Sequence, residues 1–389
     1  MSKEAEEQEL SEAGTESLKR RIRVGIVGCG EVTQIMHWPS LYQLSDRYEV
    51  TALCDVSPVI LEKLGKLWSV QTLTTDQREL VKESNVDAVL VANPNAFHAE
   101  ATLAAIAAGK HVLVEKPMCI TRREAEEIMA AQKKSNLVVQ VGYMRRYAPA
   151  FLDGCEAVKG MKEIRFARVR DFLGANSLVI NPTSRVIRDE QLPEAVQNEG
   201  RLRDEALVNE ALGGAPTESL KRAYRLMLGL SSHDLSAMRE LLGMPNRVIF
   251  AAQRSDGLYL AAAFDYGPYI CQFETGVDRI ARFDAHLEVY GNNKVVRIQY
   301  DTPYIRNSPI RLIVTENNGR GGVTNLESHP VWGDPFVAEW NAFYDNVTEV
   351  RAPKTGPADF AQDLELFSEM ARLMQEHELP TAKIVNHGK

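Results

Sequence analysis

Residues 21–33 read Arg-Ile-Arg-Val-Gly-Ile-Val-Gly-Cys-Gly-Glu-Val-Thr. The run 22–27 is short, apolar and rich in β-branched residues, which predicts a strand buried on both faces. Gly28 permits a tight turn directly after this strand, and Gly30 lets the backbone approach a pyrophosphate. The helix expected to begin near Glu31 aims its free N–H groups at that anion. The usual third glycine is Thr33 here, which weakens the motif taken alone.

A second predicted strand, 49–53, ends at Asp55. That carboxylate lies roughly 20 residues beyond the glycines, where dinucleotide-binding domains place an acid for the ribose hydroxyls. The combination predicts a dinucleotide-binding domain; a doubly wound domain that binds no nucleotide is the alternative. A carboxylate also repels a 2′-phosphate, and no Arg or Lys follows it in Val56-Ser57-Pro58, so NAD is favoured over NADP.

The composition is that of a globular protein with no bias toward nucleic acid. The chain has 389 residues, 44% apolar and 25% charged, which suggests two domains of ordinary size. A net charge of −8 argues against a nucleic-acid surface, and no apolar run approaches the ~20 residues that span a membrane.

The first twenty residues hold six glutamates and no apolar core. We expect residues 1–20 to be a disordered acidic tail and not a signal peptide; a short extra helix is the alternative. Five scattered cysteines without Cys-x-x-Cys spacing indicate neither a disulfide framework nor a metal site. They favour a reducing cytoplasm.

Strand and helix patterns alternate without interruption through residues 21–145. This alternation predicts a Rossmann domain with a parallel, doubly wound sheet. Ser57 is the expected N-cap of a helix, and Thr121 with Glu124 forms a capping-box pattern for another. Further strands are expected at 70–73, 87–92, 111–114 and 137–141, and helices at 58–68, 75–83, 96–108 and 121–134.

Residues 146–389 are predicted to form a substrate-binding α+β domain with an open, mainly antiparallel sheet. Its expected strands follow one another with few helices between them: 163–172, 247–254, 259–266, 269–275, 286–290, 295–300 and 310–315, with amphipathic helices at 336–347 and 358–375. The insertion 181–225 is polar and rich in Glu and Arg. It is either a lid or binding loop, which inside this domain would serve the substrate, or a solvated helical decoration.

Several motifs together resemble the Gfo/Idh/MocA oxidoreductases, which include glucose–fructose oxidoreductase and inositol dehydrogenase. The resemblance runs from about residue 22 to 375. Its marks are Gly28-Cys29-Gly30, Asp55, Asn93-Pro94-Asn95 with His98, Glu115-Lys116-Pro117, Arg145-Arg146-Tyr147-Ala148-Pro149, Ser232-His233-Asp234 and Leu241-Leu242-Gly243. It implies a nicotinamide dinucleotide on the first domain, a carbohydrate-like substrate on the second, and homo-oligomers formed through the second sheet.

The resemblance and the residue patterns together give a set of candidate site residues. Lys116 and His233 are the expected catalytic pair. Contacts to the cofactor are expected from Gly28, Gly30, Glu31, Val32, Asp55, Asn93, Asn95, His98, Glu115 and Lys116, and contacts to the substrate from Lys116, Arg145, Arg146, Tyr147 and His233.

Each candidate also has a structural alternative. Lys116 closes a parallel strand, where α/β sheets place ligands, but a lone lysine can be a solvated side chain. His233 is expected to open a helix capped by Ser231 or Ser232, and can instead be a packed histidine. Asn95 can act as an N-cap and Arg146 as a salt bridge between the domains. Trp38 can stack on the cofactor, although the core is favoured.

One departure from the family pattern concerns the acid that accompanies the histidine. The family often has Asp four residues before it, and that position is Gly229 here. Asp234 is adjacent to His233 and would point elsewhere on a helix. The glycine and the insertion are similar to those of bacterial glycoside 3-dehydrogenases.

These observations predict an NAD-dependent dehydrogenase of a sugar, polyol or glycoside, acting on one secondary hydroxyl or the matching ketone. One alternative is redox-neutral chemistry, in which NAD oxidises the sugar transiently and is regenerated; tight retention of the cofactor would favour it. A non-catalytic NAD-binding sensor is the alternative of another class.

Overall fold

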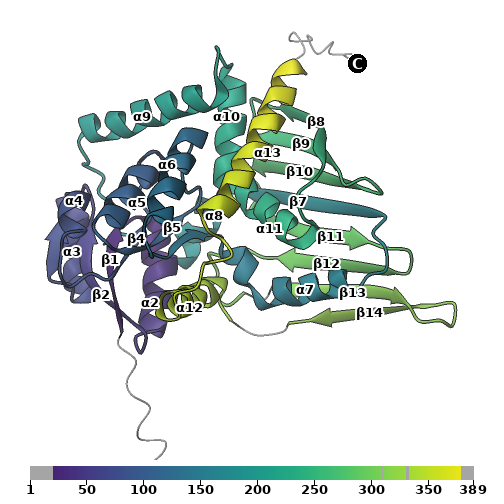
Figure 1. Cartoon of the computed structure of the whole chain (residues 1–389), viewed down its shortest axis with the longest axis horizontal. Coiled ribbons are helices and arrows are strands. Elements are labelled where there is room, and N and C mark those ends of the chain that lie inside the picture. Colours follow the sequence, from purple (N-terminus) through teal and green to yellow (C-terminus); the bar gives the residue numbers. More distant parts are fainter. Residues whose placement is uncertain (1–20, 309, 330–332, 378–389) are drawn as a thin grey trace, which may run out of the picture.

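The computed structural model describes residues 21–308, 310–329 and 333–377. It contains two β-sheets that lie side by side, each with its own helices (Figure 1). The acidic tail expected at residues 1–20 falls outside the described residues. Within them no helix is long and apolar enough to cross a membrane. All five cysteines are free and buried.

The first sheet has six strands, all parallel, in the order β3-β2-β1-β4-β5-β6. This confirms the doubly wound fold class. Its central strands β1 and β4 are buried almost throughout, as their continuous apolar sequence predicts. The strands are β1 (Ile22–Val27), β2 (Tyr48–Cys54), β3 (Thr72–Thr74), β4 (Ala88–Val91), β5 (His111–Glu115) and β6 (Val139–Gly142).

Short helical segments connect these strands. Ser57 accepts the N–H of Ile60, and Thr121 and Glu124 form the reciprocal capping box, so both predicted caps are present. The segments are η1 (Thr33–His37), α2 (Trp38–Gln43), α3 (Pro58–Trp68), α4 (Gln77–Leu80), η2 (Asn95–Phe97), α5 (His98–Ala107) and α6 (Arg122–Lys133). Trp38 stacks on Trp68 at 4.1 Å between ring centroids, and both rings are half-buried against the core of the first domain.

The second sheet has eight strands in the order β14-β13-β12-β11-β7-β10-β9-β8, and every neighbouring pair except β7 and β10 is antiparallel. The strands are β7 (Phe166–Gly174), β8 (Arg247–Arg254), β9 (Tyr259–Asp265), β10 (Ile270–Asp278), β11 (Phe283–Tyr290), β12 (Lys294–Tyr300), β13 (Arg311–Asn317) and β14 (Val323–Ser328). The sequence analysis missed β14, because this edge strand is exposed almost throughout and carries no buried alternation.

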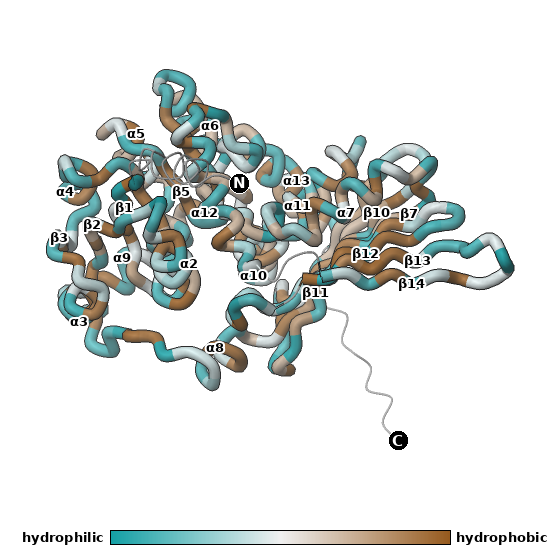
Figure 2. Tube along the Cα trace, turned by 90° about the horizontal axis from the view of Figure 1, so that it is seen from below, coloured by the Kyte–Doolittle hydropathy of each residue, from teal (hydrophilic) through white to brown (hydrophobic). Residues whose placement is uncertain are grey.

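Helices cover one face of this second sheet (Figure 1). They are η3 (Met144–Tyr147), α7 (Pro149–Lys159), α11 (Ser232–Leu242) and α13 (Pro357–Glu376). Apolar side chains of β7, β10 and β12 that face the helices belong to the main core. Figure 2 shows this sheet edge-on, with hydrophobic stretches along its strands.

Helix α12 (Pro335–Thr348) returns from the second sheet to the first domain. Trp340 is fully buried in a core cluster with residues of β1 and β2, and its carbonyl accepts the hydroxyl of Tyr48 at 2.7 Å. The division at residues 21–145 and 146–389 stays a prediction, but part of the second segment completes the core of the first.

The insertion is largely helical and consists of α8 (Ser177–Thr183), an irregular stretch, α9 (Glu194–Leu212) and α10 (Glu218–Leu226). It is more than a solvated decoration, since Leu207, Val208 and Tyr224 are buried in the main core. Figure 1 shows α9 crossing over the first domain, and not over the second sheet from which the insertion starts.

Candidate active site

The glycine turn after β1 is fixed by backbone contacts. Gly28 has φ +95°, and a Cβ there would lie 2.4 Å from the backbone of Ala92 and Asn93. A Cβ on Gly30 would meet no described atom within 4 Å, so the space above it is open. Thr33 stands in place of the third glycine. Its hydroxyl donates to the Gly28 carbonyl at 2.6 Å and stabilises the turn.

Asp55 is held against this turn. Its carboxylate accepts the N–H of Cys29 and the N–H of Ser57, both at 2.9 Å. Two bonds leave part of its acceptor capacity free, since an ionised carboxylate offers about four lone-pair positions. The side chain is therefore oriented before any ligand arrives.

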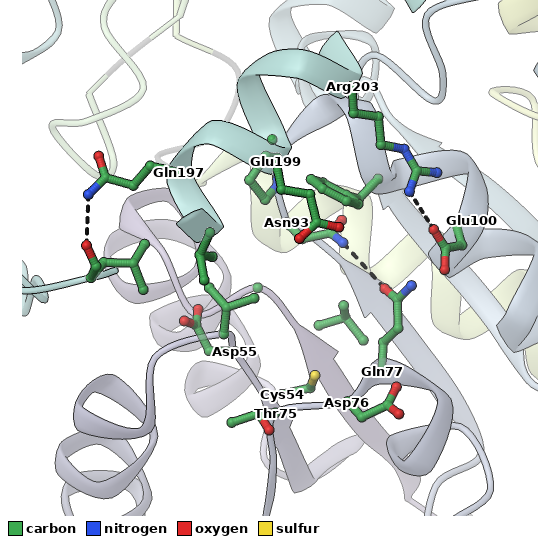
Figure 3. A pocket seen from close by; sticks show the side chains of 18 of the residues that line it. Cys54, Asp55, Thr75, Asp76, Gln77, Asn93, Glu100, Gln197, Glu199 and Arg203 are labelled. Atoms are coloured by element: carbon green, nitrogen blue, oxygen red, sulfur yellow. Dashed lines mark hydrogen bonds and ion pairs between the residues drawn. The ribbon is translucent and has the colours of Figure 1, made fainter. Parts of the chain in front are cut away.

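A cavity of about 670 Å³ lies beside Asp55. One side is formed by the carboxyl ends of the first sheet, including Thr75, Asp76 and Asn93. The other side is formed by the start of α9 and the residues before it, which lie over the cavity in Figure 3. Residues of the insertion line this cavity and none of the described cavities that Lys116 lines, so a role of the insertion toward the substrate stays a prediction.

A second cavity of about 190 Å³ continues from the first, and Asn93 lines both. The buried Oδ1 of Asn93 has no hydrogen-bond partner among the described residues. Five further predicted cofactor contacts line this cavity: Val32, Asn95, His98, Glu115 and Lys116. Glu31 lines neither cavity; its carboxylate pairs with Arg188 of the insertion. Asn95 starts η2 and makes no capping hydrogen bond there.

Buried polar groups position two walls of the second cavity. The ring nitrogens of His98 face the carbonyls of Pro117 at 2.7 Å and Asn93 at 2.6 Å, so His98 ties the ends of β4 and β5 together. Burial lowers the pKa of His98 despite these two carbonyls.

Glu115 is fixed from the opposite side. It accepts from His37 Nε2 at 2.9 Å and from the N–H of Lys116 at 3.0 Å. Trp340 Nε1 donates to His37 Nδ1 at 3.1 Å, which leaves Nε2 as the protonated nitrogen of a neutral ring. Burial opposes ionisation of Glu115, but the interactions with His37, Lys116 and His98 together outweigh it, and the pKa of Glu115 is lowered.

Lys116 lies at the carboxyl end of β5 and reaches the second domain. Its Nζ donates to the carbonyl of Gly229 at 2.6 Å. Burial lowers the pKa of the Lys116 ammonium, although Glu115 acts in the opposite direction. The side chain is half-buried and bonded to the second domain, so it is not the fully solvated lysine of the alternative.

His233 stands across from Lys116. Its buried Nδ1 has no hydrogen-bond partner in the described part of the chain. Burial, with Lys116 and Arg145 nearby, holds the pKa of His233 well below its usual value, so the ring is neutral near pH 7. His233 does not open a helix: α10, the π-helix η4 (Met227–Ser231) and α11 follow one another without a break, and Ser232 donates to the Leu228 carbonyl instead of capping.

A third cavity of about 240 Å³ lies between the sheets and shares Lys116 and His233 with the second. Arg145 lines it and bridges Asp171 at 2.9 Å and Asp234 at 2.6 Å, so Asp234 points away from His233 as expected. The other lining residues are Met144, Leu173, Ala175, Asn176, Gly229, Leu230, Val277, Phe283, Pro303 and Tyr304.

Sequence reasoning missed two polar residues of this third cavity. Asn176 donates to the hydroxyl of Tyr304 at 3.0 Å, and Tyr304 lines both smaller cavities. Burial raises the pKa of Tyr304 to about 12, so its hydroxyl stays protonated near pH 7. Neither residue belongs to a sequence motif; both lie in loops next to strands of the second sheet.

Arg146 and Tyr147 are not brought to any of the three cavities, which corrects their expected contact with the substrate. Arg146 pairs with Glu240 at 2.6 Å and with Asp359, and the hydroxyl of Tyr147 bonds Thr355 Oγ1 at 2.8 Å. Both side chains are buried and join the start of the second domain to its C-terminal part. Arg146 thus forms salt bridges, but within residues 146–389 and not between the two domains as the alternative had it.

Residues 22–143 match the Gfo/Idh/MocA oxidoreductase family, which has an NAD-binding Rossmann fold. The match covers the first domain, so residues 22–143 are similar to the NAD-binding domain of this family. The oxidoreductase P35 of Formosa agariphila is 31% identical over 35% of this chain and 42% of that relative, so the alignment spans less than half of its length. The myo-inositol 2-dehydrogenase of Thermotoga maritima is 24% identical over 87% of this chain and 92% of that relative.

Two solved structures of similar fold cover nearly all of the chain. Levoglucosan dehydrogenase, in complex with NADH and levoglucosan, has a TM-score of 0.70 at 17% identity and covers 92% of this chain and 98% of that one. A 3-ketoreductase from Actinomadura kijaniata, with NADP and TDP-benzene, has a TM-score of 0.68 at 20% identity and covers 90% and 96%. At these identities the likeness shows the shared fold.

The residues of the first two cavities fit the dinucleotide of the Gfo/Idh/MocA family. The turn at Gly28 has no room for a side chain, the space over Gly30 is open, and a fixed carboxylate stands at Asp55. The unpartnered Oδ1 of Asn93 lies where the two cavities meet.

Substitution by alanine should have different effects at Gly28 and at Gly30. Gly28→Ala should lower the melting temperature of the ligand-free protein, because the methyl group meets backbone at 2.4 Å and the φ is positive. Gly30→Ala should leave the melting temperature unchanged and weaken NADH binding, because its methyl group fills space that the pyrophosphate needs. Thermal unfolding and fluorescence titration measure both; equal binding by Gly30→Ala and the parent would exclude a pyrophosphate there.

Proposed function

We propose that this protein is an NAD-dependent dehydrogenase that oxidises a secondary hydroxyl of a sugar, polyol or glycoside, or reduces the matching ketone. The observation that carries the proposal is that Lys116 and His233 line both the cavity at the end of the first sheet and the cavity between the sheets. A group that handles the hydroxyl proton must stand between cofactor and substrate in this way. Relatives named for myo-inositol and levoglucosan oxidation support the substrate class.

A bound NAD would supply the hydride acceptor. The chain's own contribution to the reaction is a neutral base beside the carbinol. Lys116 has a lowered pKa, and its bond to the Gly229 carbonyl fixes Nζ without adding charge. We assign it the removal of the hydroxyl proton. A neutral His233 would hydrogen-bond the same hydroxyl or its neighbour.

The substrate cavity suits one ring with several hydroxyl groups. Its volume of about 240 Å³ lies below the roughly 300–1,000 Å³ of most sites for larger ligands. Asn176, Arg145 and Tyr304 offer polar contacts, and Phe283 with Leu173 offers apolar ones. An aglycone would have to extend out of the cavity toward solvent.

The assignment of NAD rests on Asp55, which would accept hydroxyls of the adenosine ribose and repel a 2′-phosphate. Of the three arginines that line the same cavity, Arg201 bonds the side chain of Asn198 at 3.5 Å, and Arg78 and Arg203 are both paired with Glu100 at 3.0 Å and 2.6 Å. The two arginines paired with Glu100 are therefore less available to a phosphate than unpaired arginines would be. Homo-oligomers through the second sheet and a cytoplasmic location remain predictions.

The direct test is a screen for NADH absorbance at 340 nm with sugars, inositols and glycosides. We expect steady NADH formation with at least one of them. Failure of the protein to bind NADH at all would refute the proposal. A cofactor retained through purification, with turnover but no net NADH, would favour the redox-neutral alternative instead.

Replacing the proposed base should slow the chemical step. Lys116→Ala should lower kcat by roughly 10²–10⁴ and leave the NADH affinity nearly intact. His233→Ala should cost less, and the double variant should be far from additive if both act on one proton. Lys66→Ala, at an exposed position on α3, is the control. A larger loss for His233→Ala than for Lys116→Ala would overturn the assignment.

The pH profile should report Lys116 and respond to a charge at Gly229. Oxidation should rise with pH along one limb, because only the deprotonated amine accepts the proton. Gly229 is helical and has open space at its Cβ, so Gly229→Asp is tolerated and should move the limb up by roughly one unit through stabilisation of the ammonium. Gly229→Ala, the neutral control, should leave the limb in place. Identical profiles for the two variants would contradict this role of Lys116.

Charge at residue 55 should govern the choice between the two dinucleotides. Asp55→Asn keeps a hydrogen-bond acceptor for the Cys29 N–H but removes the charge, so NADP binding should improve relative to NAD. Asp55→Ala should in addition weaken NAD binding. Fluorescence titrations with both reduced cofactors give the ratio; a ratio equal to that of the parent would exclude Asp55 as the selecting group.

A further inference from the structure

The stretch between α8 and α9 runs across the first domain as a strap, defined here as residues 184–193. In Figure 2 it extends from α8, near the second sheet, to the side of α3.

Three successive residues of the strap bind the first domain. The backbone N–H of Ile187 donates to Gln34 Oε1 at 2.8 Å, and its carbonyl accepts from Gln34 Nε2 at 2.9 Å. Arg188 pairs with Glu31, directly after the glycine turn. Asp189 accepts the hydroxyl of Ser57 at 2.5 Å, two residues after Asp55. These contacts place the strap beside the glycine turn and beside Asp55, the two elements expected to bind the dinucleotide.

Helix α9, which follows the strap, is anchored on the other side of the cavity. Arg203 bonds Glu100 at 2.6 Å and lies over the ring of Phe97 at 4.6 Å. The strap and α9 together therefore span the cavity from the start of η1 to the start of α5.

The covered cavity is the adenosine end of the proposed cofactor site, since it is lined by Asp55, Asn93 and Pro94 and not by Lys116. Seven of its twenty lining residues come from the insertion: Leu192, Val196, Gln197, Glu199, Gly200, Arg201 and Arg203. Figure 3 shows Glu199 pointing from α9 into the cavity toward Asn93. Half-buried Leu192 and Val196 are the apolar side chains on the insertion side, where an adenine face would pack.

We propose that the insertion is the second wall of the adenosine subsite: Leu192 and Val196 pack on the adenine, and the strap must detach from the first domain before the dinucleotide leaves. The inference rests on the proposed function, because it requires a dinucleotide in this cavity. It adds residues outside the Rossmann domain to the binding site and makes cofactor exchange depend on Asp189 and its neighbours.

The wall is tested by truncating two side chains of the insertion and by comparing NADH with a shorter ligand. The probes are NADH and reduced nicotinamide mononucleotide, which lacks the adenosine half. Leu192→Ala combined with Val196→Ala should weaken NADH binding by about tenfold or more and leave mononucleotide binding unchanged. Leu202→Ala, at an exposed position of α9, is the matched control and should change neither.

The strap is tested by the rate at which NADH leaves. Asp189→Asn weakens the contact with Ser57 and should speed NADH release at least several-fold in a stopped-flow displacement experiment. Glu190→Gln removes the neighbouring exposed carboxylate and should not. Thermal unfolding of all variants identifies any loss of folding.

The outcomes separate the two proposals. If the parent protein binds no NADH, the proposed function fails. If the parent binds NADH but the Leu192 and Val196 variant and Asp189→Asn match it in affinity and release rate, only the second wall is refuted. Equal weakening of NADH and of the mononucleotide would also refute it, because the effect would then not be at the adenosine end.

Discussion

The bond from Lys116 Nζ to the carbonyl of Gly229 joins the two halves of the molecule at the site. Lys116 directly follows the parallel strand β5, at the carboxyl edge of the sheet where the loops of such folds form ligand sites. Gly229 lies in a π-helical turn, a conformation in which the backbone departs from regular α-helical bonding and is frequent at functional sites. The positions of His233, Arg145 and Tyr304 around Lys116 all depend on this approach of the two sheets.

Buried groups balance the charge around this contact, but they differ from the family pattern, which often has Asp at the position of Gly229. Arg145 is enclosed with Asp171 and Asp234 and lies near the rings of Phe283 and Tyr300. A buried cation would be costly unless it were paired in this way. Within the described residues no acid bonds His233 Nδ1, although Asp171 Oδ1 and Asp234 Oδ2 are also without a hydrogen-bond partner. The site therefore combines an uncharged histidine with a lysine of lowered pKa.

Local patterns predicted much of this site. The turn at Gly28, the carboxylate of Asp55 and the strand end at Lys116 are each fixed by a few neighbouring residues, so the sequence could reveal them. Tyr304 could not be found in this way, because its place depends on how the second sheet packs against the first. The place of the insertion 181–225 could not be found either: its polarity suggested a covering segment, but only the fold decides which cavity it lines.

Helix α12 has a consequence for the ancestry and engineering of such chains. Trp340 completes the core beneath β1 and β2 and also holds His37, the partner of Glu115. The insertion closes the opposite side of the same domain. Recombination that exchanged only the N-terminal segment between relatives would leave these surfaces facing unmatched neighbours. A viable chimera would have to transfer α12 and the insertion together with residues 21–145, so inheritance of the two domains is coupled by their packing.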